Sequence, residues 1–464
     1  MERLKELRKT LHSIETVSEL LEQFTPRRLE RFSFVLLVIL VLSPLYAMGW
    51  SLFFGRHTDE AYIANLLGLG SAWHTLLIQI GYIGVIVAII LFAKSVDLAR
   101  KNGIRPADYM KQHVVEIFLF LFIFWTVLAT VFSINPSLSL KGDFYRREGL
   151  WTYGAYLGIF ALAKTQTRLN IVRLVSLFVG VGALLGVLDM MDVDAINRVF
   201  TLKKKTSIFH NANHYGYYLV MGVMANALLI LNLRTLKSPL AVPLLIFHGL
   251  FAAVVINNHS FGAFIALFAT FIIVLLLVLW LKRKLFLRTL LLAVMFLLVS
   301  WFQSLADDYL ASEVSNTRED VANIIENNED ASSGGTGRWS LWVNGVSFAL
   351  EKPLFGYGPD TLGVPYEDAG NNTDRPHNEP VQFAASQGIP ALIFYLAAVT
   401  SLAVMAFRKR HALSVLTLTL GFVVIGYLAS SMFGNTMYYT TPFYVMSLAL
   451  TLSRVKATAY QPSN

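Results

Sequence analysis

The chain has 464 residues, of which 55% are hydrophobic and 15% are charged, and it contains no cysteine. Soluble globular proteins carry about 25% charged residues, so this composition and a mean hydropathy of +0.55 predict a membrane protein. The missing cysteine excludes disulfides, thiolate metal sites and cysteine nucleophiles, and the formal charge of +8 fits anchoring on the cytoplasmic side better than nucleic-acid binding.

The N-terminal residues 1–31 are polar and charged. Within them, residues 1–24 carry leucines and isoleucine on one helical stripe with basic flanks, which predicts an amphipathic helix on the cytoplasmic leaflet. About twelve apolar runs follow, each of a length that crosses a bilayer. The sequence therefore predicts an all-α, polytopic integral membrane protein. The runs occupy residues 32–54, 73–93, 113–133, 149–163, 170–189, 213–232, 240–258, 261–281, 285–303, 388–407, 412–432 and 437–453.

Lysine and arginine in the short connections predict the orientation of these helices. Basic residues gather in 1–31, 94–111, 282–284 and 408–410, which all fall on one side of the predicted topology. By the positive-inside rule both termini are expected in the cytoplasm. The chain then divides into a cytoplasmic segment 1–31, nine helices in 32–303, a large outer loop 304–387, and three helices with a cytoplasmic tail in 388–464.

Two outer connections break this rule. One carries Arg146 and Arg147, and the other carries Lys203, Lys204 and Lys205. Positive charge placed against the usual bias favours an anionic ligand on that side, whereas a solvated or headgroup-facing patch is the plainer alternative. The residues alone leave both interpretations open.

The outer loop 304–387 is too long for a bare connector. A glycine-rich turn at 334–337 precedes a predicted amphipathic helix that begins at Arg338, and residues 353–359 predict a compact turn. The loop ends with His377 and Asn378, directly before the tenth apolar run. Histidine is the usual general base near neutral pH, which makes His377 a candidate catalytic residue.

At these residues the chain resembles the O-antigen ligase and polymerase superfamily of bacterial membrane glycosyltransferases. The resemblance rests on His377-Asn378 followed after nine residues by Gly388, on Arg338 with Trp342 ahead of the Pro-Leu-Phe-Gly-Tyr-Gly turn at 353–358, and on the asparagine-containing stretch 208–213. Residues 147–150 supply a fourth short match. Together with the twelve predicted spans and the late large loop, the resemblance covers most of the chain from about residue 110 to residue 450.

The resemblance implies a GT-C-like fold and a periplasmic catalytic loop. It implies an inner-membrane enzyme that moves a glycan from undecaprenyl diphosphate to an acceptor hydroxyl, such as that of lipid A–core, by inversion and without metal or cofactor. His377 is expected as the base and Arg338 as the cation at the diphosphate. The residues expected to bind substrate are Arg146, Arg147, Lys203, Lys204, Lys205, His210, Asn211, Asn213 and Asn378.

Several alternatives stay open. The His-Asn-x9-Gly spacing favours a ligase, but Ala391 and Phe261 depart from the ligase pattern, so a polysaccharide polymerase is the second interpretation. Another surface-glycan or protein O-glycan ligase is a third. A twelve-helix transporter is weaker, because no two-half symmetry is visible. His210 and His214 have the spacing of a metal pair, but no third ligand stands out.

Overall fold

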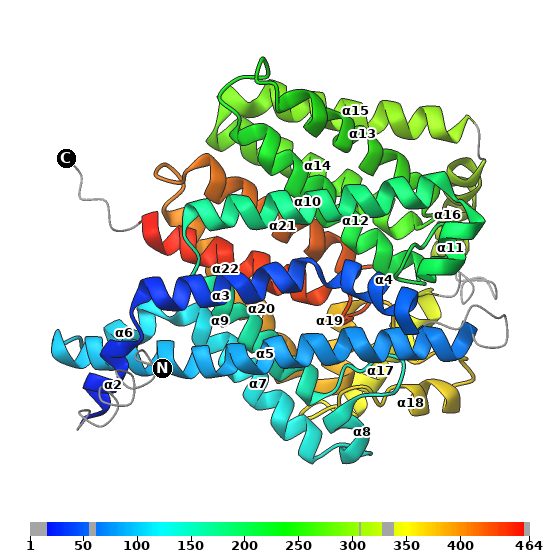
Figure 1. Ribbon diagram of the computed structural model, residues 1–464. Helices are drawn as coiled ribbons and strands as arrows, with labels where there is room; N and C mark the ends of the chain where they lie inside the picture. The colour runs from blue at the N-terminus through cyan, green and yellow to red at the C-terminus, as the bar shows by residue number, and fades with distance from the viewer. Residues whose placement is uncertain (1–15, 55–61, 306–307, 327–337, 459–464) are drawn as a thin grey trace.

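The computed structural model describes residues 16–54, 62–305, 308–326 and 338–458, and the regular elements in this part of the chain are helices. The one exception in these ranges is an isolated antiparallel bridge between Lys203 and Ser207. Figure 1 shows the longer helices running side by side, with α2 and α6 at one end and α11, α16 and α18 towards the other. The all-α prediction is confirmed.

The helices are α2 (Val17–Gln23), α3 (Pro26–Val41), α4 (Ser43–Phe54), α5 (Tyr62–Lys101), α6 (Pro106–Gln112), α7 (Val114–Val131), α8 (Pro136–Lys141), α9 (Leu150–Lys164), α10 (Arg168–Met191), α11 (Asp194–Phe200), α12 (Ala212–Asn232), α13 (Ala241–Asn257), α14 (Phe261–Leu281), η2 (Arg283–Leu285), α15 (Phe286–Ser304), α16 (Tyr309–Glu326), α17 (Arg338–Glu351), α18 (Gly363–Asp368), α19 (Glu379–Gln387), α20 (Ile389–Arg408), α21 (Val415–Ser431) and α22 (Thr441–Ala457).

Helices lie at all twelve predicted runs, but they differ in their ability to span a membrane. Among the described residues, seven are long and apolar enough to cross one, namely α5, α7, α10, α12, α14, α15 and α20. The bent pair α3–α4 makes an eighth if it is one span. The other four, α9, α13, α21 and α22, have 15 to 17 residues. The polytopic prediction is confirmed, and the count of twelve spans stays a prediction.

The first predicted run, 32–54, is broken rather than straight. The helices α3 and α4 meet at an angle of 55°, and Pro44 follows the break. Proline lacks the amide hydrogen and clashes with the preceding turn, so it kinks a helix. Ser43 at the bend accepts a hydrogen bond of 3.0 Å from the indole nitrogen of Trp73, which ties the kink to α5.

Close packing of α5 on α9 depends on small residues. A Cβ added to Gly158 would lie 1.7 Å from the carbonyl oxygen of Gly81, and one added to Gly81 would lie 2.3 Å from the Cβ of Ala155. Small residues let transmembrane helices approach until their backbones touch. Any larger side chain at Gly158 would force the two helices apart.

Helix α12 is the centre of the bundle. It packs against α10, α13, α14 and α21. Of the residues in its most apolar stretch, 94% are buried inside the protein. A helix surrounded on all sides by other helices is held rigidly by packing. Its first turn therefore offers a fixed position for a functional group.

The predicted loop 304–387 contains four helices in its described part, α16 to α19. Helix α17 begins at Arg338, as the sequence predicts, and packs against α19. Gly388 joins α19 to α20 with a φ of +89°, and a Cβ there would lie 2.1 Å from the carbonyl oxygen of Leu354. Only glycine fits this junction, which explains its place in the motif physically.

The predicted amphipathic helix 1–24 falls largely outside the described residues, which begin at residue 16. The described remainder forms α2. Its end is tied to α5, because the ammonium group of Lys94 donates to the carbonyls of Leu21 and Phe24 at 2.8 and 2.9 Å.

Candidate active site

A polar cavity of about 420 Å³ lies where α12, α17 and the end of the predicted loop meet. It joins three residues that the sequence singled out, Asn213, Arg338 and His377, although Asn213 and His377 are far apart in the chain. The cavity is lined by Asn213, Arg338, Leu341, Asn371, Asn372, Thr373 and His377. Its size is within the usual range for small-molecule sites.

His377 presents an imidazole at this cavity. Its backbone is left-handed, with a φ of +51°, and its Nδ1 lies 3.2 Å from the side-chain amide nitrogen of Asn435. Burial, together with the charges of Arg338 and Arg146, lowers the pKa of His377 to about 4, and Asp374 opposes this shift. The imidazole is therefore neutral at pH 7, the state in which it can accept a proton.

Arg338 is the first residue of α17 and points at the same cavity. Its guanidinium donates to the side-chain oxygen of Asn213 at 3.4 Å, and the same oxygen accepts a hydrogen bond of 3.1 Å from the hydroxyl of Ser260. Within the described residues Arg338 forms no salt bridge. A half-buried guanidinium without an acidic partner retains its capacity to bind an anion.

Arg146 has a different environment from Arg338. Its guanidinium forms two hydrogen bonds to the carboxylate of Asp374, at 2.7 and 2.9 Å, and lies 3.4 Å from Nε2 of His214. Burial alone would raise the pKa of Asp374, but the charges of Arg146 and Arg375 hold it at about 2. This bidentate ion pair fixes the loop segment that leads to His377.

A second ion pair lies behind the first. Arg375 pairs with Asp360, and both side chains are almost fully buried. The carboxylate of Asp360 also accepts hydrogen bonds from the backbone amides of Asp143 and Glu148, at 2.7 and 3.1 Å. The α8–α9 connection is thereby joined to the outer loop, because a buried charge needs such partners.

Residues 432–436, in the turn between α21 and α22, hold the loop segment around His377 in place. Four side chains reach it. Asn378 donates to the carbonyl of Met432 at 3.2 Å, and Arg375 donates to that of Thr436 at 3.0 Å. Gln382 donates to the hydroxyl of Thr436 at 2.9 Å, and Asn435 contacts His377 itself. The position of the imidazole thus depends on a turn that no sequence motif indicated.

The other predicted substrate residues are not among those that line the cavity. Asn211 and Asn378 are helix N-caps, whose oxygens accept from backbone amides of α12 and α19. Lys204 pairs with Asp192 at 2.5 Å, and the ammonium of Lys205 lies 3.0 Å from the ring of His259. Arg147, Lys203 and His210 are absent from the cavity lining.

Sequence reasoning missed several residues that the fold brings to the site. Asn371, Asn372 and Thr373 line the cavity, and their asparagine-rich run was the only signal. Asp374 precedes the His-Asn pair and could have been suspected as its electrostatic partner. Asn435 had no local signal, because its importance arises from a contact across 58 positions of sequence.

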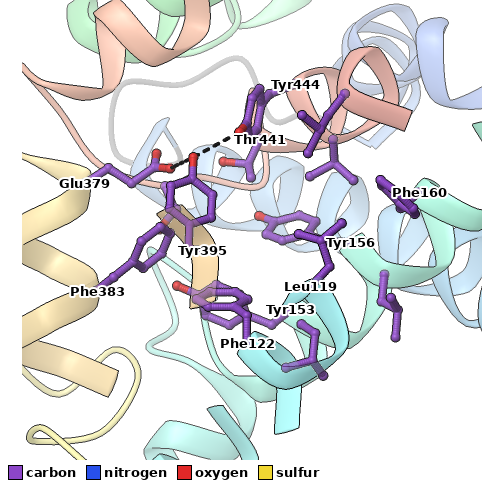
Figure 2. A pocket seen from close by; sticks show the side chains of 15 residues that line it. Leu119, Phe122, Tyr153, Tyr156, Phe160, Glu379, Phe383, Tyr395, Thr441 and Tyr444 are labelled. Atoms are coloured by element: carbon purple, nitrogen blue, oxygen red, sulfur yellow. Dashed lines mark hydrogen bonds between the residues drawn. The ribbon is translucent and has the colours of Figure 1, made fainter. Parts of the chain in front are cut away.

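Glu379, the residue after Asn378, anchors the motif in the bundle. Its buried carboxyl accepts hydrogen bonds from Tyr427 and Tyr395, at 2.9 and 3.3 Å. Figure 2 shows Glu379 and Tyr395 in line with Tyr444 at the edge of an apolar cavity of about 60 Å³. Burial raises the pKa of Glu379 to about 8, against the lowering effect of the two tyrosine hydrogen bonds. This cluster joins α19 to α20, α21 and α22.

Comparison with known proteins gives a family match for part of the chain. Residues 244–396 match a family model described as O-Antigen ligase. This range contains Arg338 and His377, whereas Asn213 and Asn435 lie outside it. No curated protein matches the chain. The match covers this part of the chain, and it agrees with the resemblance of the motifs that end the large loop to the same superfamily.

Proposed function

We propose that the chain is an O-antigen ligase-type glycosyltransferase. It moves a glycan from undecaprenyl diphosphate to an acceptor hydroxyl, that of lipid A–core, at the periplasmic face of the bacterial inner membrane. The observation that carries the proposal is the joint lining of one 420 Å³ cavity by His377 and Arg338. These residues offer a base and a cation, the two groups that transfer from a lipid diphosphate needs.

The reaction proceeds by a single displacement. The acceptor hydroxyl forms a new bond to the anomeric carbon and gives its proton to the neutral imidazole of His377. The bond from that carbon to the diphosphate breaks, and its electron pair leaves with the diphosphate. The guanidinium of Arg338 stabilises this developing charge. Attack opposite to the leaving group inverts the anomeric centre.

Lysines 203–205 and Arg147 do not line the cavity, and in this proposal their charge attracts an anionic donor at longer range. Arg146 acts through Asp374 by holding the loop. The transporter alternative is less well supported, because Glu116 and Asp189, two of the acids near the spans, have structural partners. Glu116 pairs with Lys164 and Lys456, each at 2.5 Å, and Asp189 accepts from Asn257 at 3.2 Å.

The test is a product assay with the wild-type chain. We expect purified protein, given a glycan on undecaprenyl diphosphate and lipid A–core as acceptor, to form glycan-linked lipid A–core. Addition of EDTA is expected to leave the rate unchanged, because arginine rather than a metal stabilises the leaving group. Products are separated by gel electrophoresis and identified by mass.

The outcomes separate the alternatives. Lengthening of the glycan on its carrier, with no lipid A–core product, would identify a polymerase. Loss of transfer in EDTA that returns with a divalent cation would contradict the metal-independent mechanism. Absence of both glycan products, with the protein folded and monodisperse, would contradict the ligase and polymerase assignments.

Asn435 is expected to act as a positioning residue for His377. Replacing Asn435 with alanine should lower kcat about 10-fold with little change in KM, because the imidazole loses the hydrogen bond that orients it. Asn435→Asp should move the acid limb of the kcat/KM profile to higher pH, since a carboxylate stabilises the protonated imidazole. Steady-state rates between pH 4 and pH 8 measure both effects. An unchanged acid limb in Asn435→Asp would remove Asn435 from this role.

A further inference from the structure

A second polar cavity, of about 340 Å³, lies where α10, α12, α15 and α21 come together. It is large enough for several waters or a small anionic group. Its charged lining is wholly basic. The lining residues are Arg168, Leu231, Asn232, Leu233, Arg234, Lys284, Leu285, Arg288 and Val415.

This basic cavity and the candidate active site lie at opposite ends of α12. Asn213, in the first turn of α12, lines the active-site cavity, and Asn232, its last residue, lines the basic cavity. The 21 residues of α12 extend about 30 Å, which is close to the hydrocarbon thickness of a bilayer. The basic cavity is therefore a separate site at the other face of the bundle.

The four cations of the basic cavity form no ion pair with any acidic residue in the part of the chain that the structure describes. No Asp or Glu lines it, and none of the four forms a salt bridge within residues 16–54, 62–305, 308–326 and 338–458. Arg288 is half-buried and donates to the carbonyls of Leu233 and Arg234 at 2.7 and 3.1 Å, so it caps the end of α12. The other three are exposed, and their mutual repulsion is relieved by an anion.

The surroundings of the basic cavity suit an amphiphile. Leu169 and Leu287, next in sequence to Arg168 and Arg288, have exposed fractions of 59% and 75%. Apolar side chains exposed beside a basic cavity match acyl chains beside a phosphate. The N-terminus of α10 also lies here, where the hydroxyl of its N-cap Thr167 donates to the carboxylate of Glu30 at 2.6 Å.

We propose that the basic cavity binds the phosphate of an anionic phospholipid headgroup. Arg168, Arg234 and Lys284 provide the charge that binds the phosphate. Arg288 keeps the site in shape through its hydrogen bonds to the end of α12. A free phosphate shares this chemistry, but the exposed leucines beside Arg168 and Arg288 favour the lipid. The proposal is independent of glycan transfer, because it concerns the opposite end of the bundle.

The experiment uses the full chain purified in a neutral detergent. Binding of phosphatidylglycerol, of phosphatidylcholine with the same acyl chains, and of inorganic phosphate is measured by native mass spectrometry and by the shift in Tm. A cavity triple variant carries Arg168→Gln, Arg234→Gln and Lys284→Gln, and leaves Arg288 in place. A control triple variant carries Arg100→Gln, Lys111→Gln and Lys237→Gln, which removes the same charge from exposed cations outside the cavity.

We expect phosphatidylglycerol to bind the wild type and the control variant tightly, and the cavity variant at least about 10-fold more weakly. Equal binding by the two triple variants would overturn the proposal, because the cations would then act only as general anchors. Phosphatidylcholine bound as tightly as phosphatidylglycerol would also overturn it. If inorganic phosphate bound as tightly as the lipid, and this binding were lost in the cavity variant, the cavity would be a site for free phosphate and the lipid proposal would be wrong.

Discussion

Replacing His377 with alanine is expected to lower kcat for glycan transfer by about 10²–10⁴-fold, the usual contribution of a general base. The imidazole faces the 420 Å³ cavity, and burial with two nearby arginines holds its pKa at about 4. It is therefore unprotonated at pH 7 and ready to take the acceptor proton. Initial rates with the undecaprenyl diphosphate-linked donor and lipid A–core, at matched membrane abundance, measure the loss.

His411→Ala is a matched control, because His411 is an exposed histidine in the connection between α20 and α21. This variant should transfer at the wild-type rate. A His377→Ala protein that kept the wild-type rate would exclude His377 as the base while leaving the family assignment intact. If KM for the acceptor rose and kcat did not change, His377 would bind the acceptor without taking its proton.

Replacing Arg338 with glutamine is expected to lower kcat by about 10²–10³-fold, the effect of losing one donor to a developing charge. Arg338→Lys should retain part of the rate, because a lysine keeps the charge but loses the planar fork that matches a diphosphate. The same assay measures both variants. Arg318→Gln, which removes an exposed arginine from α16, should leave the rate unchanged.

The Arg338→Gln variant carries a second readout in its pH dependence. Burial is the largest cause of the low pKa of His377, and the charge of Arg338 is the next largest. Its removal raises that pKa from about 4 towards 6.5, so His377 becomes protonated, and inactive as a base, at a higher pH. The acid limb of the kcat/KM profile should move upward. An acid limb that stays in place while kcat falls would show that the two residues are not electrostatically coupled.

The sequence determined the helical elements of this protein, because an apolar run of membrane length can satisfy its backbone only as a helix. It also indicated three residues that meet in the candidate active-site cavity. Arg338 begins a helix after a glycine-rich stretch of sequence, Asn213 opens a buried helix, and His377 lies at the end of the predicted loop. Each has a local signal, and the resemblance to a known family joined them.

The sequence was less informative about lengths and breaks. Helix α5 has 40 residues, about 60 Å, where the apolar run predicted only its middle. At the C-terminal end, the largely polar residues 94–101 continue the helix past the apolar run without any change in backbone preference, so hydropathy underestimates its length there. The bend at Pro44 was signalled by the proline, but its direction depends on the contact of Ser43 with Trp73.

Tertiary structure alone decided which basic residues are available for an anion. Arg146 and Arg338 look alike in sequence, yet Arg146 is paired with Asp374 and Arg338 has no acidic partner among the described residues. The same holds for the support of His377 by Asn435 and for the basic cavity at the far end of α12. Charge pairing depends on distances of a few ångströms between segments far apart in the chain, and no local pattern of residues encodes those distances.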